Sequence, residues 1–152
     1  MLERSVETPF GQLGVQSVDG EIIGLRWFGT TTGHPDETLM QATQQLTEYA
    51  QGLRQDFDLP LRLSGPPLVQ AVARAMLAIP FGETRTYGDI AREVGASAQA
   101  VGQACGANPI PILVPGHRVM GANGKLTGFS GAGGVETKVA LLRHEGAGSF
   151  LL

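Results

Sequence analysis

A Ser64-Gly65-Pro66-Pro67 segment divides the chain into two halves whose apolar residues follow different patterns. Glycine and paired prolines interrupt helices and strands alike, so regular structure is not expected to run through this segment. Before it, short β-prone runs alternate with glycine, and after it apolar residues recur at helical spacing. The chain of 152 residues is therefore predicted to form an α+β protein with two lobes, residues 1–64 and residues 65–152.

The first lobe is predicted to be a small antiparallel sheet with one helix. Asp19-Gly20 lies between two apolar runs, which is a typical hairpin signal, so we expect two or three strands between Thr8 and Phe28. A helix is expected from about Asp36, its N-cap, to Gln51, because apolar residues recur at helical spacing as far as Leu53. Residues 57–63 alternate as in a further strand.

The second lobe is predicted to consist mainly of helices. The first carries an amphipathic pattern from Val69 and stops at Pro80. Two short helices follow, one over residues 87–94 and one capped by Ser97, and together they form a helix-turn-helix candidate. A last helix is expected over about residues 135–143.

The turn between the two short helices, at Gly95-Ala96, leaves one face of the second helix available to DNA. That face presents Gln99 and Gln103, whose amides can hydrogen-bond phosphates or base edges. The inner face is expected to consist of Ala98, Val101 and Cys105. Such helix pairs also occur in proteins that never touch DNA, so this pattern alone leaves the function open.

Charge and cysteine content limit the function classes. The single cysteine excludes an internal disulfide framework, and three scattered histidines exclude a Cys/His zinc cluster. No apolar run reaches the length of a membrane span or of a signal peptide, so we expect a monomeric cytoplasmic protein without metal, cofactor or membrane partner. The net charge of −3 divides into −5 for residues 1–70 and +2 for residues 71–152, which favours the second half for any polyanion.

The stretch Asn108–Val119 (NPIPILVPGHRV) is the best candidate for a rigid functional loop. Its prolines restrict the chain to extended conformations and so deliver Gly116-His117-Arg118 at a fixed place. Asn108 can tie the turn by hydrogen-bonding nearby backbone groups. A loop held in this way suits a reactive residue.

Four motifs in order resemble the O6-alkylguanine-DNA alkyltransferase family: IPFGETRTYGDIA (79–91), NPIPILVPGHRV (108–119), LTGFSG (126–131) and LLRHEG (141–146). The resemblance is weak over residues 1–60 and strong from 79 to 146. It implies a ribonuclease H-like first lobe and a winged-helix-like second lobe, whose helix-turn-helix enters the DNA minor groove while the damaged guanine is flipped out. In the family a loop cysteine takes the alkyl group from guanine O6, helped by a glutamate–histidine–water relay.

The resemblance implies lesion-binding roles for five residues. Tyr87 matches a tyrosine that aids nucleotide rotation, and Phe129 and Ser130 match an aromatic residue and a serine that faces guanine O6. Gln99, next to Ala100, stands where the family usually has an arginine that enters the base stack. An amide brings less stacking area and no charge, so flipping is expected to be weaker here.

The relay positions also match. Asn108 corresponds to the family's hinge asparagine, His117 and Glu145 to its relay, and Arg118 to the structural arginine that borders the lesion site. From the residues alone, Glu145 would instead be read as an exposed residue near a helix end and His117 as a packed loop histidine.

One position departs from the family in a way that decides the function. The family's Pro-Cys-His-Arg reads Pro-Gly-His-Arg here, so Gly116 occupies the position of the acceptor cysteine and has no side chain that can attack carbon. Cys105 is expected to pack inside its helix as a small hydrophobe and not to replace it. Alkyl transfer to this position is therefore excluded.

Loss of the cysteine resembles the alkyltransferase-like branch, whose members bind alkylated guanine without repairing it. The expected partners are then double-stranded DNA containing O6-alkylguanine, and nucleotide excision repair proteins that take over the lesion. Two alternatives stay open. The chain is a cysteine-to-glycine form of an active methylated-DNA–protein-cysteine methyltransferase, or it is a helix-turn-helix DNA-binding regulator.

Overall fold

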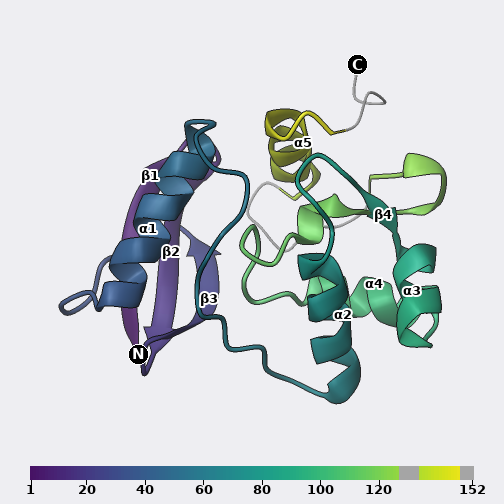
Figure 1. The fold of residues 1–152 in the computed structure, drawn as a ribbon, viewed down its shortest axis with the longest axis horizontal. Coiled ribbons are helices and arrows are strands. Elements are labelled where there is room, and N and C mark those ends of the chain that lie inside the picture. The colour runs from purple at the N-terminus through teal and green to yellow at the C-terminus, as the bar shows by residue number, and fades with distance from the viewer. Residues whose placement is uncertain (127–133, 148–152) are drawn as a thin grey trace. The chain divides into compact units, whose positions relative to one another are not determined.

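A three-stranded antiparallel sheet with one helix builds the first part of the chain, and four α-helices make up most of the described second part (Figure 1). The computed structural model describes residues 1–126 and 134–147. Contacts divide the chain into two units, Met1–Arg62 and Leu63–Leu152. The predicted α+β class is confirmed.

The sheet consists of β1 (Leu2–Thr8), β2 (Gly11–Val18) and β3 (Glu21–Trp27), in the order β1-β2-β3. Asp19 and Gly20 join β2 to β3 with φ angles of 50° and 78°, the geometry of a two-residue hairpin turn. The predicted hairpin is confirmed. The expected strand region misses β1, because LERSVET lacks regular apolar alternation.

Helix α1 (Glu37–Ala50) packs on one face of this sheet (Figure 1). Asp36 caps it, since its Oδ1 accepts a hydrogen bond from Leu39 N at 2.8 Å. The buried face of α1 meets apolar residues of the strands, and the resulting core comprises Leu13, Val15, Leu25, Leu39, Leu46 and Tyr49. The predicted helix and its cap are confirmed.

Two expectations for the first unit are wrong. Leu53 lies beyond the end of α1 and is 75% exposed, so the helical spacing extends past the helix itself. Residues 57–63 do not form a strand; only Leu61 makes a single parallel bridge with Ile22. Pro60 contributes its carbonyl to Ile22 N at 2.8 Å but has no N–H to continue the pairing.

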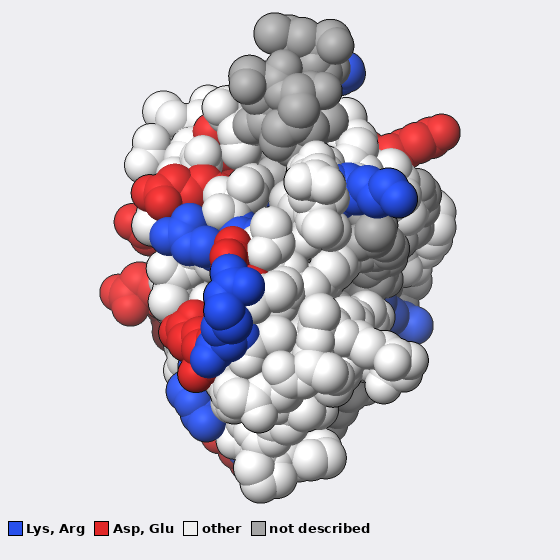
Figure 2. Space-filling model, turned by 90° about the vertical axis from the view of Figure 1, so that its right-hand side faces the viewer, with Lys and Arg blue, Asp and Glu red and all other residues white. Residues whose placement is uncertain are grey.

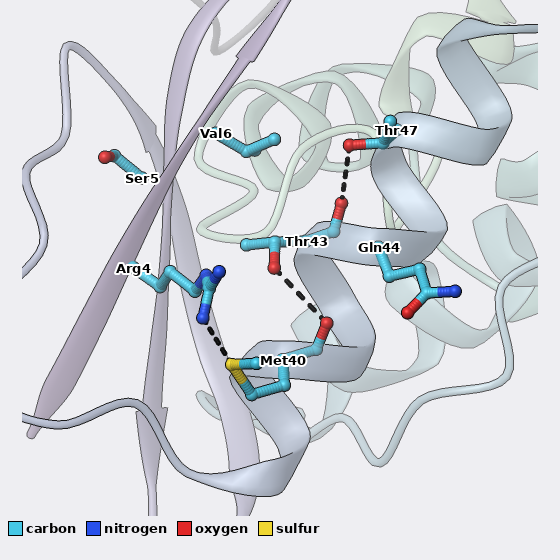
Figure 3. Close-up of a pocket in the computed structure, with 7 residues that line it drawn as sticks. All are labelled: Arg4, Ser5, Val6, Met40, Thr43, Gln44 and Thr47. Atoms are coloured by element: carbon cyan, nitrogen blue, oxygen red, sulfur yellow. Dashed lines mark hydrogen bonds between the residues drawn. The ribbon is translucent and has the colours of Figure 1, made fainter.

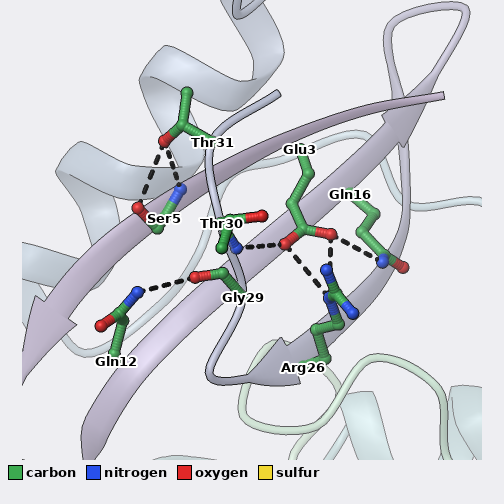
Figure 4. Close-up of polar contacts among 8 residues, drawn as sticks. All are labelled: Glu3, Ser5, Gln12, Gln16, Arg26, Gly29, Thr30 and Thr31. Carbon is green, nitrogen blue, oxygen red and sulfur yellow. Dashed lines mark hydrogen bonds and ion pairs between the residues drawn. The ribbon is translucent and has the colours of Figure 1, made fainter. Parts of the chain in front are cut away.

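On the other face of the sheet, the buried carboxylate of Glu3 connects several segments (Figure 4). It accepts hydrogen bonds from Arg26 Nε at 2.9 Å, from Gln16 Nε2 at 2.9 Å and from Thr30 N at 2.7 Å. Burial by itself raises the pKa of Glu3, but these bonds lower its pKa overall. Glu3 therefore stays ionised and ties β1 to its neighbours.

Beside Glu3, the chain after β3 crosses the sheet at a contact between two glycines (Figure 4). A Cβ on Gly14 would lie 2.7 Å from the Cα of Gly29, and a Cβ on Gly29 would lie 2.6 Å from Oε2 of Glu3. Gln12 Nε2 donates to Gly29 O at 2.8 Å, and Thr32 then bridges to the outer edge of β1. Only glycine fits at this crossing.

We expect Gly29→Ala to lower the free energy of unfolding by about 1–3 kcal/mol, because the new methyl forces the backbone or Glu3 to move. Urea-induced unfolding measures the change. Gly102→Ala is the control: nothing described lies within 4 Å of a Cβ there, and this helical glycine should gain roughly 0.5–1 kcal/mol instead. Equal stability of Gly29→Ala and the unaltered protein would contradict the steric argument.

The helices of the second unit are α2 (Pro67–Leu77), α3 (Tyr87–Val94), α4 (Ala98–Gly106) and α5 (Val135–His144). Predicted helices occur at all four places, although α2 begins with a proline two residues earlier than expected. Two-residue strands β4 (Arg85–Thr86) and β5 (Val119–Met120) pair in parallel. These strands are too short for a sequence pattern to reveal. No helix in the described ranges is long and apolar enough to cross a membrane.

Candidate functional site

Local hydrogen bonds cap the start of both α3 and α4, which are joined by the turn at Gly95-Ala96. Thr86 Oγ1 accepts from Asp89 N at 3.0 Å, and Asp89 Oδ2 accepts from Thr86 N at 2.9 Å, which makes a capping box. Gly95 ends α3 with φ 73°, and Ser97 Oγ accepts from Ala100 N at 3.1 Å at the start of α4. The predicted ends at Gly95 and Ser97 are confirmed.

The outer face of α4 is polar but uncharged. Gln99 and Gln103 are exposed, as expected, and Ala100 is half-buried between them. Ala98 is exposed instead of buried, because it is the first helical residue and precedes the face that packs on α2 and α3. The buried face consists of Val101, Ala104 and Cys105.

Part of the positive charge of the second half is buried or paired with acidic side chains, although Arg74, Lys125 and Arg143 are exposed. Arg118 and Lys138 are buried, and Arg85 and Arg92 form surface ion pairs with Glu83 and Asp89. The side of the molecule shown in Figure 2 accordingly has a broad uncharged area, with basic and acidic side chains intermingled along one edge. Phosphate attraction is therefore weaker than the charge count indicates.

The loop after α4 is held by Asn108 and is buried over residues 110–120. Asn108 Oδ1 accepts from Ile110 N at 3.0 Å, while its Nδ2 donates to Val114 O at 2.9 Å. Ile112 adopts a φ of 73°, which is a rare conformation for a β-branched residue and costs about 1–3 kcal/mol. Its surroundings therefore impose the loop's shape.

Gly116 is buried and begins a short 3₁₀ helix, Gly116–Arg118. Its φ lies outside the left-handed region that favours glycine. Among the described residues, a Cβ at Gly116 would meet Asn108 Nδ2 at 3.3 Å and Met76 Sδ at 3.9 Å. We call the space bordered by these two atoms the acceptor seat. The backbone at the seat suits an L-residue as well as glycine.

The next two residues of the turn, His117 and Arg118, converge on Glu145 at the end of α5. His117 Nε2 lies 2.8 Å from Glu145 Oε2, and Arg118 forms a fork to both carboxylate oxygens at 2.8 and 2.9 Å. Arg118 Nη1 also donates to Ile79 O at 2.7 Å, and the guanidinium lies over the ring of Phe81. Glu145 is buried, so reading it as an exposed helix-end residue is wrong.

This cluster has a defined protonation state at neutral pH. Burial raises the pKa of Glu145, but hydrogen bonds from His117 and Arg118 outweigh it and hold that pKa far below its usual value. Burial lowers the pKa of His117, against the influence of Glu145. An ionised Glu145 can only accept, so a neutral His117 donates through Nε2 and keeps its lone pair on Nδ1. His117 is therefore a base whose orientation is set by Glu145.

Two buried groups beside the cluster are missed by the sequence analysis. Lys138 is fully buried, and its Nζ donates to Val119 O at 2.5 Å; burial lowers its pKa to about 8. Helical spacing places Lys138 on the face of Leu141 and Leu142, which is the signal that could have revealed it. Met76 lies outside the sequence motifs, and its sulfur approaches the acceptor seat only in the folded chain.

The structure brings together one group of predicted site residues and leaves others separate. Asn108, Gly116, His117, Arg118 and Glu145 form one cluster of loop and helix end. The remaining positions belong to α3 and α4 or lie outside the described residues: Tyr87, half-buried at the start of α3; Gln99 and Ala100 on α4; and Phe129 and Ser130, which are not described.

A hollow of about 340 Å³ in the first unit, between β1 and α1, holds none of the predicted site residues (Figure 3). Thr43 and Thr47 on its wall donate their hydroxyls to carbonyls one turn earlier in α1, and Arg4 donates to the sulfur of Met40. In the described parts of both units, no group of three His, Cys, Asp or Glu residues is placed to hold a metal ion.

Comparison with known proteins places both units in one class. Residues 1–63 match the ribonuclease-like domain of 6-O-methylguanine DNA methyltransferase, and residues 67–147 match the DNA binding domain of the same protein. The fold and the two matches define a two-domain DNA alkylation-repair architecture. The chain belongs to the 6-O-methylguanine DNA methyltransferase family.

Characterised relatives cover most of the chain. It is 42% identical over 151 residues to the methylated-DNA–protein-cysteine methyltransferase of Mycobacterium tuberculosis, covering 93% of this chain and 90% of the relative. It is also 42% identical over 154 residues to the constitutive Bacillus subtilis enzyme, covering 93% of each. The crystal structure of M. tuberculosis O6-methylguanine methyltransferase aligns with a TM-score of 0.84 over 96% of this chain and 93% of that one. The M. tuberculosis protein in complex with DNA aligns with a TM-score of 0.83 and 42% identity over 94% and 92% of the two chains.

Proposed function

We propose that this chain is a DNA-binding repair protein that recognises O6-alkylguanine by nucleotide flipping and does not transfer the alkyl group to a residue of its own. The carrying observation is Gly116, which leaves the acceptor seat without a nucleophile while the buried His117–Glu145–Arg118 cluster is complete. The lesion pocket belongs to residues 65–152. Nucleotide excision repair proteins would then take over the marked lesion.

Cys105 does not supply the missing nucleophile. It is the only cysteine of the chain and packs on the buried face of α4. Burial raises the pKa of its thiol to about 11, so the nucleophilic thiolate is scarce at neutral pH. Because Gly116 has no nucleophile and the thiol of Cys105 is buried, we expect the protein to bind the lesion without transferring the alkyl group to itself.

DNA contact is assigned to α4 and the start of α3. Gln99 and Gln103 are exposed amides that can read base edges or phosphates, and Tyr87 at the start of α3 would assist rotation of the nucleotide, as the family resemblance implies. A damaged base costs less to extrude than a paired one, which favours the lesion even with glutamine as the inserted side chain.

A gel shift with matched duplexes tests the proposal. We expect the O6-methylguanine duplex to bind about tenfold or more tightly than its guanine twin, equivalent to roughly 1.4 kcal/mol. Because few cations on α3 and α4 are unpaired with surface acids, the slope of log affinity against log salt should be shallow, about −2 to −3. Equal affinities for the two duplexes would overturn the proposal, and preference for one base sequence regardless of damage would indicate a regulator.

One observation favours a second candidate, a cysteine-to-glycine form of an active methyltransferase. The backbone at Gly116 has an ordinary φ, and a Cβ there would require Asn108 to move by only a few tenths of an ångström, so the local backbone does not require glycine. The relatives that match over 93% of the chain are methyltransferases by name. Restoring a cysteine at position 116 decides between the lesion-binding protein and the cysteine-to-glycine form of a methyltransferase.

A further inference from the structure

The buried base beside Gly116 has the chemistry to activate a nucleophile that the chain itself does not supply. His117 is fully buried, 2.8 Å from a carboxylate that is in turn held by Arg118. A carboxylate partner fixes the tautomer of the imidazole and partly offsets the loss of basicity that burial causes. Lesion binding alone does not use this basicity.

The acceptor seat is lined by groups that suit sulfur. Asn108 Nδ2 gives one hydrogen to Val114 O, and its second hydrogen can donate to an anion beside Gly116, 3.3 Å from the Cβ position. Met76 Sδ, at 3.9 Å from the same position, supplies a soft, polarizable contact. The amide donor of Asn108 and the thioether of Met76 together complement a bound thiolate better than they complement a bound hydroxide.

We propose that a small aliphatic thiol from solution occupies the acceptor seat and takes the alkyl group from O6-alkylguanine, an activity that rests on the lesion binding proposed above. The thiol proton passes to the imidazole of His117. The sulfur forms a bond to the alkyl carbon as the bond from that carbon to guanine O6 breaks, and the electron pair stays on guanine. Guanine then takes up the proton, and the thioether leaves.

This chemistry differs from transfer to a cysteine in its stoichiometry. Gly116 is unchanged after each event, so one protein molecule can repair many lesions. The thiol of cysteine has a pKa of about 8.5, and simple alkanethiols ionise at still higher pH, so a positioned base increases the small share that reacts as thiolate at neutral pH. Occupancy of the seat should fall sharply as the thiol grows, because Asn108 and Met76 border it closely.

The experiment incubates the full chain with an O6-methylguanine duplex in excess and with methanethiol, ethanethiol or glutathione. Dimethyl sulfide from methanethiol is measured by gas chromatography with mass spectrometry, and repaired duplex by nucleoside analysis. We expect more than one thioether per protein molecule, formed about 100-fold faster than without protein, the contribution of a positioned base. The rate should fall in the order methanethiol, ethanethiol, glutathione.

Three variants separate the seat from the rest of the protein. Gly116→Ala, which places a methyl in the seat, should reduce the thiol-dependent rate at least about tenfold. His117→Gln should also reduce it and leave only the rise with pH that ionisation of the thiol itself causes. Glu48→Ala in α1 is the control, because Glu48 belongs to the first unit and lies outside the residues assigned to DNA or lesion contact, and it should keep the full rate.

The outcomes distinguish this inference from the proposed function. Lesion-selective gel shifts with no thioether above the protein-free reaction overturn the thiol inference and leave lesion binding standing. Loss of lesion preference in the gel shift overturns the proposed function itself. Thioether formation that survives unchanged in Gly116→Ala also overturns the inference, because the reaction would then occur outside the seat.

Discussion

Gly116→Cys is expected to turn the protein into a methyl acceptor that reacts once. The backbone φ at this position suits an L-residue, and the new Cβ requires Asn108 to move by only a few tenths of an ångström from its 3.3 Å contact. His117, held neutral by burial and oriented by Glu145, then lies next in sequence to a thiol that it can deprotonate. The unaltered protein should show no covalent methyl at all, so the change is from none to one per chain.

Intact-protein mass spectrometry after incubation with O6-methylguanine duplex measures this gain. Gly116→Ser is the matched control, because its hydroxyl has a similar shape but does not ionise near neutral pH. Methylation of the cysteine variant shows that the seat and its base are intact and supports the cysteine-to-glycine interpretation. A cysteine variant that folds, binds the lesion and gains no methyl removes that interpretation.

Glu145→Ala is expected to lower the free energy of unfolding by about 3–5 kcal/mol, because it leaves the guanidinium of Arg118 buried without its carboxylate. Urea-induced unfolding measures the loss. The control is Glu48→Ala, which breaks the partly exposed pair with Arg54 and should cost about 1 kcal/mol or less. Equal losses in the two variants would show that the buried cluster contributes nothing special.

The same cluster makes the protein sensitive to acid. The pKa of Glu145 is lowered by folding, so its stabilising contribution is present above the ordinary value of 4.5 and is lost as the pH falls below it. The pKa of His117 is also lowered, so the unfolded chain takes up a proton below the ordinary value of 6.5 while the folded chain does not. Both effects reduce stability in acid. His117→Gln should flatten the decline between about pH 7 and pH 5.

Local signals in the sequence predict those elements that neighbouring residues determine. Asp19-Gly20 specifies its hairpin because both residues tolerate positive φ, and Asp36 and Ser97 cap helices by bonds within one turn. Long-range contacts defeat the same reasoning. The most buried residue of β1 is Glu3. The hydrogen-bond partners of its carboxylate are distant in sequence, so no local pattern predicts them.

The candidate site depends on both kinds of information. Family resemblance selects Asn108, His117, Arg118 and Glu145, and the fold brings them within hydrogen-bond reach of one another or of the loop they hold. Their roles stay predictions until variants are measured. The sulfur of Met76 at the acceptor seat could not be predicted, because its approach to Gly116 depends on how α2 packs.

The strained Ile112 in the loop before Gly116 has a consequence for how such a protein changes over time. Prolines, Asn108 and the imposed backbone at Ile112 determine the path of the loop, whereas reactivity depends on the side chain at position 116, which takes no part in the hydrogen bonds of the loop. A change of this one codon can convert a protein that repairs the lesion into one that only binds it, or the reverse. The fold that recognises the lesion is not disturbed by the change.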